Sequence, residues 1–199
     1  TPLGTGTLTT DSGGLTLRHT HIDAEVSAGL ALVSVVQDFT NPFSEPIDAT
    51  YVLPLPPDAA VSGFQMACGD RVIEGEIKDR AAAREAFEQA RQSGQRAALL
   101  EQLRENLFRQ EIAGICPGED VEVTVSYVQQ VARDSGRAVL AFPTTVGERY
   151  DAPADLTVPT HVDAPEEGGR SLTVTALIDE GMSIRQLWSD SHAIEVWDE

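Results

Sequence analysis

Two histidines, His19 and His21, are the first side chains of the sequence whose types and spacing could do chemistry. Residues two positions apart in a β-strand point to the same face, so both imidazoles would stand on one surface and could begin a zinc site. No further histidine or cysteine lies near them in the sequence. A surface or half-buried pair is the simpler interpretation, and we predict no metal ligands here.

The run Asp190-Ser191-His192 contains the residue types of a hydrolase triad. A triad is defined by spatial geometry, so three sequence neighbours more simply form a polar turn before a strand. Glu101 and Gln102 lie in an apolar run before Asn106, and a carboxyl group in a dry site can become a tuned acid. We favour the alternative, in which these side chains satisfy buried backbone groups.

Acidic residues concentrate between residues 151 and 170, where they could gather calcium: Asp151, Asp155, Asp163, Glu166 and Glu167. They lack the regular spacing of a calcium loop, so we interpret this stretch as an acidic linker or sheet edge. The two cysteines, Cys68 and Cys116, lack the spacing of a metal site, and their sequence leaves open whether they form a disulfide. No glycine-rich phosphate loop occurs. We predict no catalytic, cofactor-binding or metal-binding residues and no cofactor.

The charge of the chain restricts its partners. The 199 residues contain 32 acidic and 14 basic side chains, a net charge of −18. Phosphate backbones and anionic lipids are repelled by such a surface, so nucleic acid is excluded as a partner, while cations and basic proteins are easier partners. The hydrophobic content of 41% suffices for a core. No apolar run reaches the ~18 residues of a transmembrane helix, so we predict no direct membrane insertion.

The elements that would position these side chains are mostly short strands separated by turns. Apolar residues alternate in 121–131, and 61–67 and 71–77 predict a hairpin around Gly69-Asp70. One amphipathic helix is predicted at about 79–93, because its apolar residues share one stripe: Ala83, Ala86, Phe87 and Ala90. The segment 97–103 has helix-forming residues after a helix-ending Gly94, which leaves helix and strand open.

About ten strands and one helix predict a mainly β fold, an antiparallel β-sandwich or open barrel. We expect a flexible lead-in at 1–14, a β domain at 15–150, the acidic linker or edge at 151–170, and additional strands at 171–199. The additional strands are predicted at 172–178, 184–188 and 194–197. Because the sequence stops directly after a strand, we expect the natural protein to continue into a further domain.

Six pieces of the sequence, in order, resemble the vault protein inter-alpha-trypsin (VIT) domain. They are VQDFTNP (36–42), ATYVLPLPPDAAVSGFQM (49–66), GDRVIEGEIKDRAAAREAFEQA (69–90), GQRAALLEQLRENLFRQEI (94–112), PGEDVEVTVSYVQ (117–129) and LAFP (140–143). The resemblance covers roughly residues 15–150 and favours a strand at 97–103. Residues 172–196 are similar to the segment that leads towards a von Willebrand factor A domain, and the acidic, arginine-rich composition fits a bacterial member.

The resemblance implies a non-catalytic interaction or scaffold module of a larger secreted, periplasmic or cell-surface protein. Such a module would pack against a downstream A-type domain of the same polypeptide and against an unknown extracellular or surface protein. Exposed strand edges and an apolar rim would make the contacts, and the rim candidates are Pro54, Leu55, Pro56 and Trp188. Two alternatives stay open: a hydrolase that uses paired carboxylates on a β-sandwich, and a calcium-stabilised structural domain.

Overall fold

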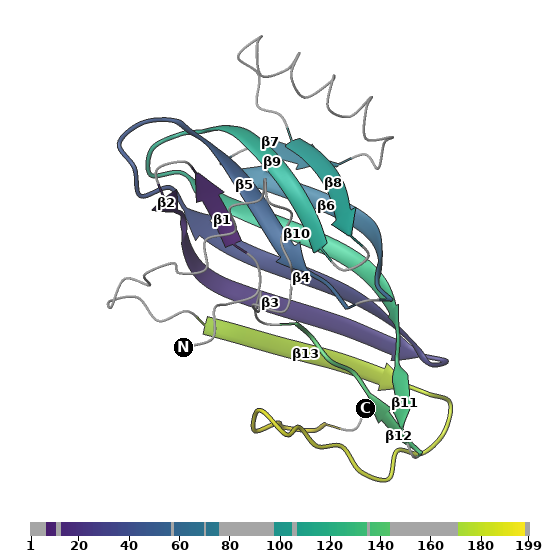
Figure 1. Cartoon of the computed structure of the whole chain (residues 1–199). Helices are drawn as coiled ribbons and strands as arrows, with labels where there is room; N and C mark the ends of the chain where they lie inside the picture. The colour runs from purple at the N-terminus through teal and green to yellow at the C-terminus, as the bar shows by residue number, and fades with distance from the viewer. Residues whose placement is uncertain are drawn as a thin grey trace.

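The computed structural model describes residues 7–10, 13–56, 58–69, 71–75, 98–104, 107–134, 136–143 and 171–197. Within these ranges two β-sheets pack face to face beside a small hairpin (Figure 1). The strands are β1 (Thr7–Thr10), β2 (Gly13–Gly14), β3 (Thr16–Ser27), β4 (Leu30–Thr40), β5 (Ile47–Pro54), β6 (Ala60–Cys68), β7 (Arg71–Glu74), β8 (Ala98–Arg104), β9 (Leu107–Ile115), β10 (Asp120–Gln130), β11 (Ala132–Asp134), β12 (Arg137–Val139) and β13 (Ser171–Asp179).

The larger sheet has six strands in the order β13-β3-β4-β10-β6-β7. Along β10, Val121, Val123, Val125 and Tyr127 are buried, while the residues between them are exposed or half-buried. This period of two is expected where one face of a sheet packs on a core and the other meets water. The neighbouring strands are antiparallel except β13, which pairs in parallel with β3.

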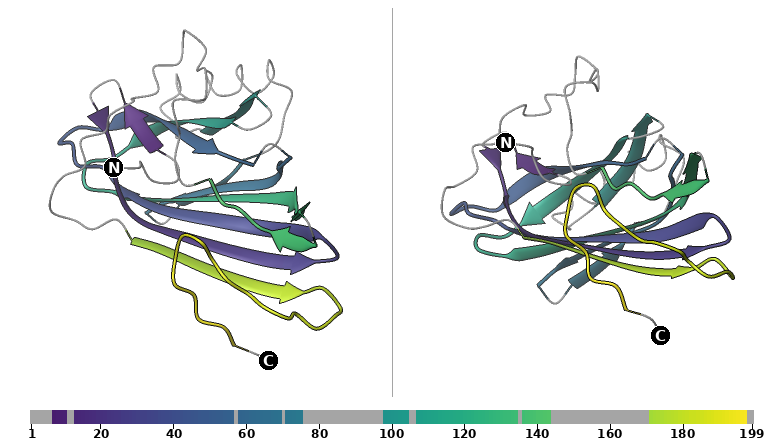
Figure 2. Two further views of the ribbon diagram at one scale, coloured as in Figure 1. Left: turned by 60° about the horizontal axis from the view of Figure 1, so that its bottom comes forward. Right: turned by 90° about the horizontal axis from the view of Figure 1, so that it is seen from below.

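The smaller sheet has five strands in the order β2-β1-β5-β9-β8. Its inner residues Leu8, Tyr51, Leu53 and Ile112 are each 1% exposed and belong to the hydrophobic core. Figure 2 shows the two sheets that face each other across it. Leu8 lies in β1, within the stretch that the sequence predicts as a flexible lead-in. Part of that stretch therefore belongs to the fold, because β1 pairs with β5.

The turn after β4 is fixed by Asn41, a residue of the VQDFTNP piece that is only 1% exposed. Its Nδ2 donates to the carbonyl oxygens of Ile115 at 3.1 Å and Cys116 at 3.0 Å, and its Oδ1 accepts from the N–H of Phe43 at 2.9 Å. One amide side chain thus connects the β4–β5 turn to the β9–β10 turn and holds these two turns together.

The predicted β-sandwich is confirmed in the described ranges, and its sheets do not close into a barrel. Residues 98–104 form β8, as the resemblance predicts, because pairing with β9 outweighs their helix propensity. The predicted helix at 79–93 lies outside the described residues. The described ranges contain no helix long and apolar enough to cross a membrane.

The strands predicted at 184–188 and 194–197 are wrong. Both segments are irregular and exposed in the structure, and only β13 forms a strand after residue 170 in the described part of the chain. The reason is physical: an apolar, β-branched segment becomes a strand only where a neighbouring strand satisfies its backbone, and no described strand pairs with either segment.

Candidate functional site

His19 and His21 lie on the outer face of β3, where their side chains contact neighbouring residues. Nδ1 of His19 is 2.6 Å from Oγ of Ser171 on β13, and Nε2 of His21 is 2.9 Å from a carboxylate oxygen of Asp23. The two rings stack with their centroids 6.3 Å apart. No group of three His, Cys, Asp or Glu side chains among the described residues is arranged to hold a metal ion. The contacts of the pair support a structural role beside β13.

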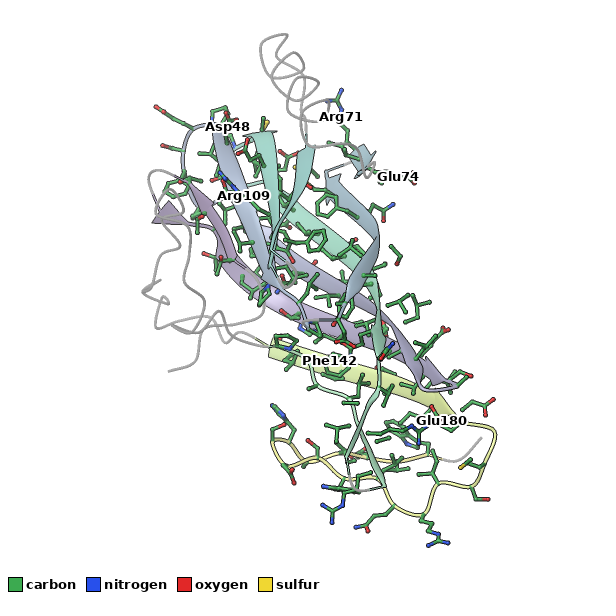
Figure 3. The ribbon with its side chains drawn as sticks, turned by 45° about the vertical axis from the view of Figure 1, so that its right-hand side comes forward. Asp48, Arg71, Glu74, Arg109, Phe142 and Glu180 are labelled. Atoms are coloured by element: carbon green, nitrogen blue, oxygen red, sulfur yellow. The ribbon has the colours of Figure 1, made fainter. Side chains whose placement is uncertain are left out.

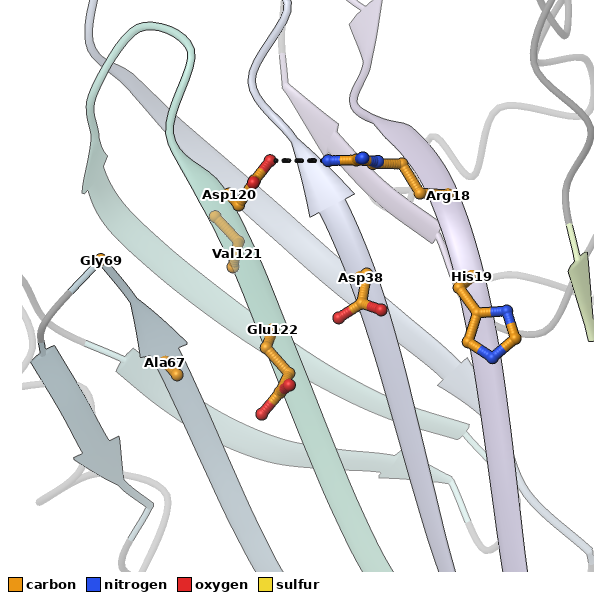
Figure 4. A pocket seen from close by; sticks show the side chains of 8 residues that line it. All are labelled: Arg18, His19, Asp38, Ala67, Gly69, Asp120, Val121 and Glu122. Carbon is orange, nitrogen blue, oxygen red and sulfur yellow. Dashed lines mark hydrogen bonds and ion pairs between the residues drawn. The ribbon is translucent and has the colours of Figure 1, made fainter. Parts of the chain in front are cut away.

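An open groove of about 770 Å³ crosses the outer face of the larger sheet (Figure 4). The strand registers place His19 beside Asp38 and Asp38 beside Glu122, so that three side chains line up across β3, β4 and β10. At one end, Arg18 forms an ion pair with Asp120 at 3.2 Å. Two carboxylates on directly paired residues repel each other, so the groove is suited to a cationic or hydrogen-bond-donating group.

The groove could not be found from the sequence alone. The alternation of β4 and β10 places Asp38 and Glu122 on the solvent face, but the two strands are far apart in the chain. Only the register of the folded sheet brings them side by side.

The run Asp190-Ser191-His192 forms an exposed turn, as the sequence predicts. Oγ of Ser189 accepts from the backbone N–H groups of Ser191 at 3.4 Å and His192 at 3.3 Å, and Nδ1 of His192 is 2.8 Å from Oγ of Ser191. These contacts join residues no more than three positions apart, which is the pattern of a local polar turn.

The other candidate acids are not brought into a described site. Glu101 and Gln102 lie in β8, opposite Arg109 and Phe108 of β9. Their side chains, Asn106 and the acidic stretch 151–170 lie outside the described residues. The buried-acid and calcium hypotheses therefore stay predictions.

The two cysteines lie in different surroundings. Cys68 is 2% exposed in the core, and Cys116 is exposed in the turn after β9. No disulfide joins these two described residues. The β-sandwich is thus held together by packing and hydrogen bonds.

The predicted apolar rim is wrong for three of its four residues. Pro54, Leu55 and Pro56 are buried, so they contribute to the core rather than to a contact surface. Apolar residues at a strand end can be buried or exposed. Which of the two occurs depends on covering residues that are distant in the sequence, so apolar character alone does not decide it. Trp188 is 47% exposed, as predicted, and the guanidinium carbon of Arg137 lies 5.4 Å from its ring centroid.

Among the residues that the structure describes, the largest group of exposed apolar side chains lies on β13 and the segment after it. This segment turns back after Asp179 and runs on the same side of the molecule as β13 (Figures 1 and 2). Ten apolar side chains here are 39% to 76% exposed, and we call this group the C-terminal apolar surface: Leu172, Val174, Leu177, Met182, Ile184, Leu187, Trp188, Ile194, Val196 and Trp197. The group includes both faces of β13, since Val174 lies opposite the buried Ile22 and Leu177 lies opposite the exposed Glu25. Large exposed apolar groups mark surfaces that bind other proteins. Sequence reasoning found the strand but missed its exposure.

The C-terminal end of β13 is anchored to the rest of the fold by Glu180 (Figure 3). One carboxylate oxygen of Glu180 accepts from the N–H of Gly29 at 3.1 Å, and the other accepts from the guanidinium of Arg133 at 3.1 Å. Gly29 has a φ of 77° and lies in the tight β3–β4 turn, where its carbonyl accepts from the N–H of Val131 at 2.9 Å. The segment that carries Met182 to Trp197 therefore leaves the sheet at a fixed point.

A family model of the vault protein inter-alpha-trypsin domain matches residues 17–127, more than half of the chain. The chain belongs to the VIT domain family. The match runs from β3 into β10 and so contains the Asn41 corner, and it ends before β13 and the C-terminal apolar surface.

Curated relatives are much longer proteins. The chain is 32% identical over 126 residues to mouse protein mono-ADP-ribosyltransferase PARP4, which covers 63% of this chain and 6% of that protein. It is 26% identical over 193 residues to human von Willebrand factor A domain-containing protein 5A, covering 93% of this chain and 25% of that protein. The chain thus spans a quarter or less of these relatives.

A third relative, a von Willebrand factor A domain-containing protein of Dictyostelium discoideum (DDB_G0292028), is 32% identical over 120 residues, which cover 60% of this chain and 13% of that protein. Among solved structures, an M1 zinc metallopeptidase of Deinococcus radiodurans aligns with 65% of this chain and 23% of its own at 18% identity. Its TM-score of 0.30 is too low to carry an argument. Two of the three relatives are thus named for a von Willebrand factor A domain.

Proposed function

We propose that this VIT domain is a non-catalytic interaction module of a larger protein, and that it packs against a von Willebrand factor A-type domain of the same polypeptide. The observation that carries the proposal is the C-terminal apolar surface, which leaves ten large apolar side chains in contact with water. The choice of an A-type domain as the partner is supported by two relatives that are named as von Willebrand factor A domain-containing proteins.

The energetic reason lies in the size of these side chains. Fully burying a leucine, isoleucine or methionine contributes about 1.5–3 kcal/mol, and the aromatic rings of Trp188 and Trp197 bury more area than any of these. Met182 and Trp197 are both 76% exposed. A partner that covers even part of the surface gains several such contributions, which offset the cost of association.

The non-catalytic part of the proposal is supported by the roles of the reactive side chains. His19 and His21 contact Ser171 and Asp23, and His192 lies in a local turn with Ser191. Each of these contacts has a structural explanation.

An extracytoplasmic location also belongs to the proposal, and the family resemblance supports it. Fractionation of cells that produce the tagged full-length protein tests this location.

The only two tryptophans of the chain, Trp188 and Trp197, both lie on the C-terminal apolar surface, so they report on its environment. The chain is labelled with fluorotryptophan, and the A-type domain encoded in the same gene is added without label. Both fluorine NMR resonances should shift on docking, and Trp188→Phe and Trp197→Phe assign them. Unmoved resonances at saturating A-type domain, or a gene without such a domain, would overturn the proposal.

A further inference from the structure

The β13 edge of the larger sheet differs from the opposite edge in length and in charge, two features that protect an edge strand. β7, at the far edge, has only four residues and carries charges at both ends, Arg71 and Glu74 (Figure 3). β13 has nine residues, contains no Lys, Arg or Pro, and carries its one charge at its end, Asp179. Natural sheets blunt their edges with short strands and charges, because an unpaired row of backbone groups invites another strand. β7 fits that rule and β13 does not.

Among the described strands, β13 has a hydrogen-bonded neighbour on one side only. It pairs with β3 in unbroken parallel register from Ser171 opposite His19 to Asp179 opposite Ser27. No strand within the described ranges lies on its other side. Since neighbouring residues of a strand direct their backbone groups to opposite sides, about half of the β13 amides point away from β3.

This edge is held in position at both ends. Oγ of Ser171 is 2.6 Å from Nδ1 of His19 at the start of the strand. At the finish, Glu180 bonds Gly29 and Arg133. An edge that is ordered before it binds a partner loses little conformational freedom on binding.

We propose that the free edge of β13 accepts a β-strand from the A-type-domain portion of the same polypeptide, so that the larger sheet continues across the domain boundary. The inference rests on the proposed function, and it adds the mode of contact. β13 itself carries three residues of the C-terminal apolar surface, so a strand at this edge also covers part of that surface. The incoming strand is rich in apolar or hydroxyl side chains, to match Leu172, Val174 and Leu177, and is neutral or basic opposite Asp179.

A second copy of this chain is a weaker occupant of the edge. Each copy carries a net charge of −18, and two such surfaces repel each other on approach. The partner strand from the same polypeptide is delivered at high effective concentration, which overcomes a modest repulsion. The test separates the two occupants.

Residue-resolved hydrogen exchange tests the inference, with this 199-residue chain compared with the full-length protein. Strand addition should slow exchange of the outward-facing amides of β13 by at least an order of magnitude in the full-length protein. If the fluorotryptophan resonances shift on docking while the β13 amides still exchange fast, strand addition is overturned and the docking proposal stands. If neither the resonances nor the exchange rates change, both proposals are overturned. Concentration-dependent protection in the 199-residue chain alone, with a dimer in sedimentation, would assign the edge to a second copy and overturn the inference.

A matched pair of lysine substitutions supplies the control. Val174 on β13 is 47% exposed and Val72 on β7 is 60% exposed, so either side chain can become lysine while its charge stays in water. Val174→Lys should raise β13 exchange in the full-length protein at least several-fold, and Val72→Lys should not. Both variants should keep the melting temperature of the 199-residue chain. Equal effects of the two substitutions on β13 exchange would contradict a strand partner at this edge.

Discussion

The hydroxyl of Tyr51 donates a hydrogen bond of 2.6 Å to Oε1 of Gln37 across the interior of the sandwich. Tyr51 belongs to β5 of the smaller sheet and Gln37 to β4 of the larger. Nε2 of Gln37 donates in turn to Oγ1 of Thr20 on β3 at 3.0 Å. Gln37 is 0% exposed, so this polar chain lies in the dry core, where hydrogen bonds are strong and their loss is costly. It sets how the two sheets face each other.

Tyr51→Phe should lower the free energy of unfolding by about 1–3 kcal/mol, because it removes the donor to a buried Oε1 and leaves the ring in place. Urea denaturation measures the change. In a Gln37→Leu background the same substitution should cost clearly less, since the acceptor is already absent. Equal costs in both backgrounds would show that the bond contributes nothing to stability.

The protein should lose stability in alkali because of its buried tyrosines. Burial raises the pKa of the Tyr51 and Tyr127 hydroxyls well above the ordinary value. Above about pH 10 the unfolded chain releases these protons and the folded protein keeps them, so the free energy of unfolding falls as pH rises, by up to about 1.4 kcal/mol per pH unit for each tyrosine. Below that pH the contribution is fully present. Urea midpoints between neutral pH and pH 11 measure the slope, which Tyr51→Phe should reduce.

Sequence patterns predicted those elements whose signal is local. The alternation of Val121, Val123, Val125 and Tyr127 is enough to define β10, because a period of two has one simple structural meaning. Gln37 could also have been found, since it lies two residues from both Val35 and Phe39 on the inner face of β4. A polar residue in that position has to be satisfied by a partner.

Features that depend on pairing between strands far apart in the chain cannot be predicted from local sequence patterns. The resemblance, rather than propensity, identified β8, because its stability comes from β9. The segments at 184–188 and 194–197 have strand-like composition and no described strand beside them, so their prediction failed. Whether Leu55 is buried or Leu172 exposed depends on which part of the chain covers each, and composition does not contain that information.

Asn41→Ala should destabilise the fold by about 1–3 kcal/mol, because the Ile115 carbonyl loses a buried donor, the Cys116 carbonyl keeps only its bond from the Glu119 N–H among those described, and the Phe43 N–H loses its acceptor. Thermal unfolding of the 199-residue chain measures the loss. Asn41→Asp is the informative companion: it keeps an acceptor for Phe43 but places a carboxylate against two carbonyl oxygens, so it should cost at least as much as alanine. An aspartate variant as stable as the parent would refute this account of the corner.

Glu180→Ala should loosen the end of β13 without unfolding the domain. The Glu180 carboxylate bonds the Gly29 N–H and pairs with Arg133, whose side chain is 64% exposed. The Glu180 side chain is 16% exposed, but water screens the pair at the arginine, and such surface pairs contribute only about 0–1 kcal/mol, so the melting temperature should change little. Exchange of the Gly29 amide and of the last β13 amides should accelerate, because the strand loses its anchor. Glu180→Gln keeps an acceptor for Gly29 and should accelerate this exchange less. Unchanged exchange at Gly29 in the alanine variant would show that Glu180 does not anchor β13.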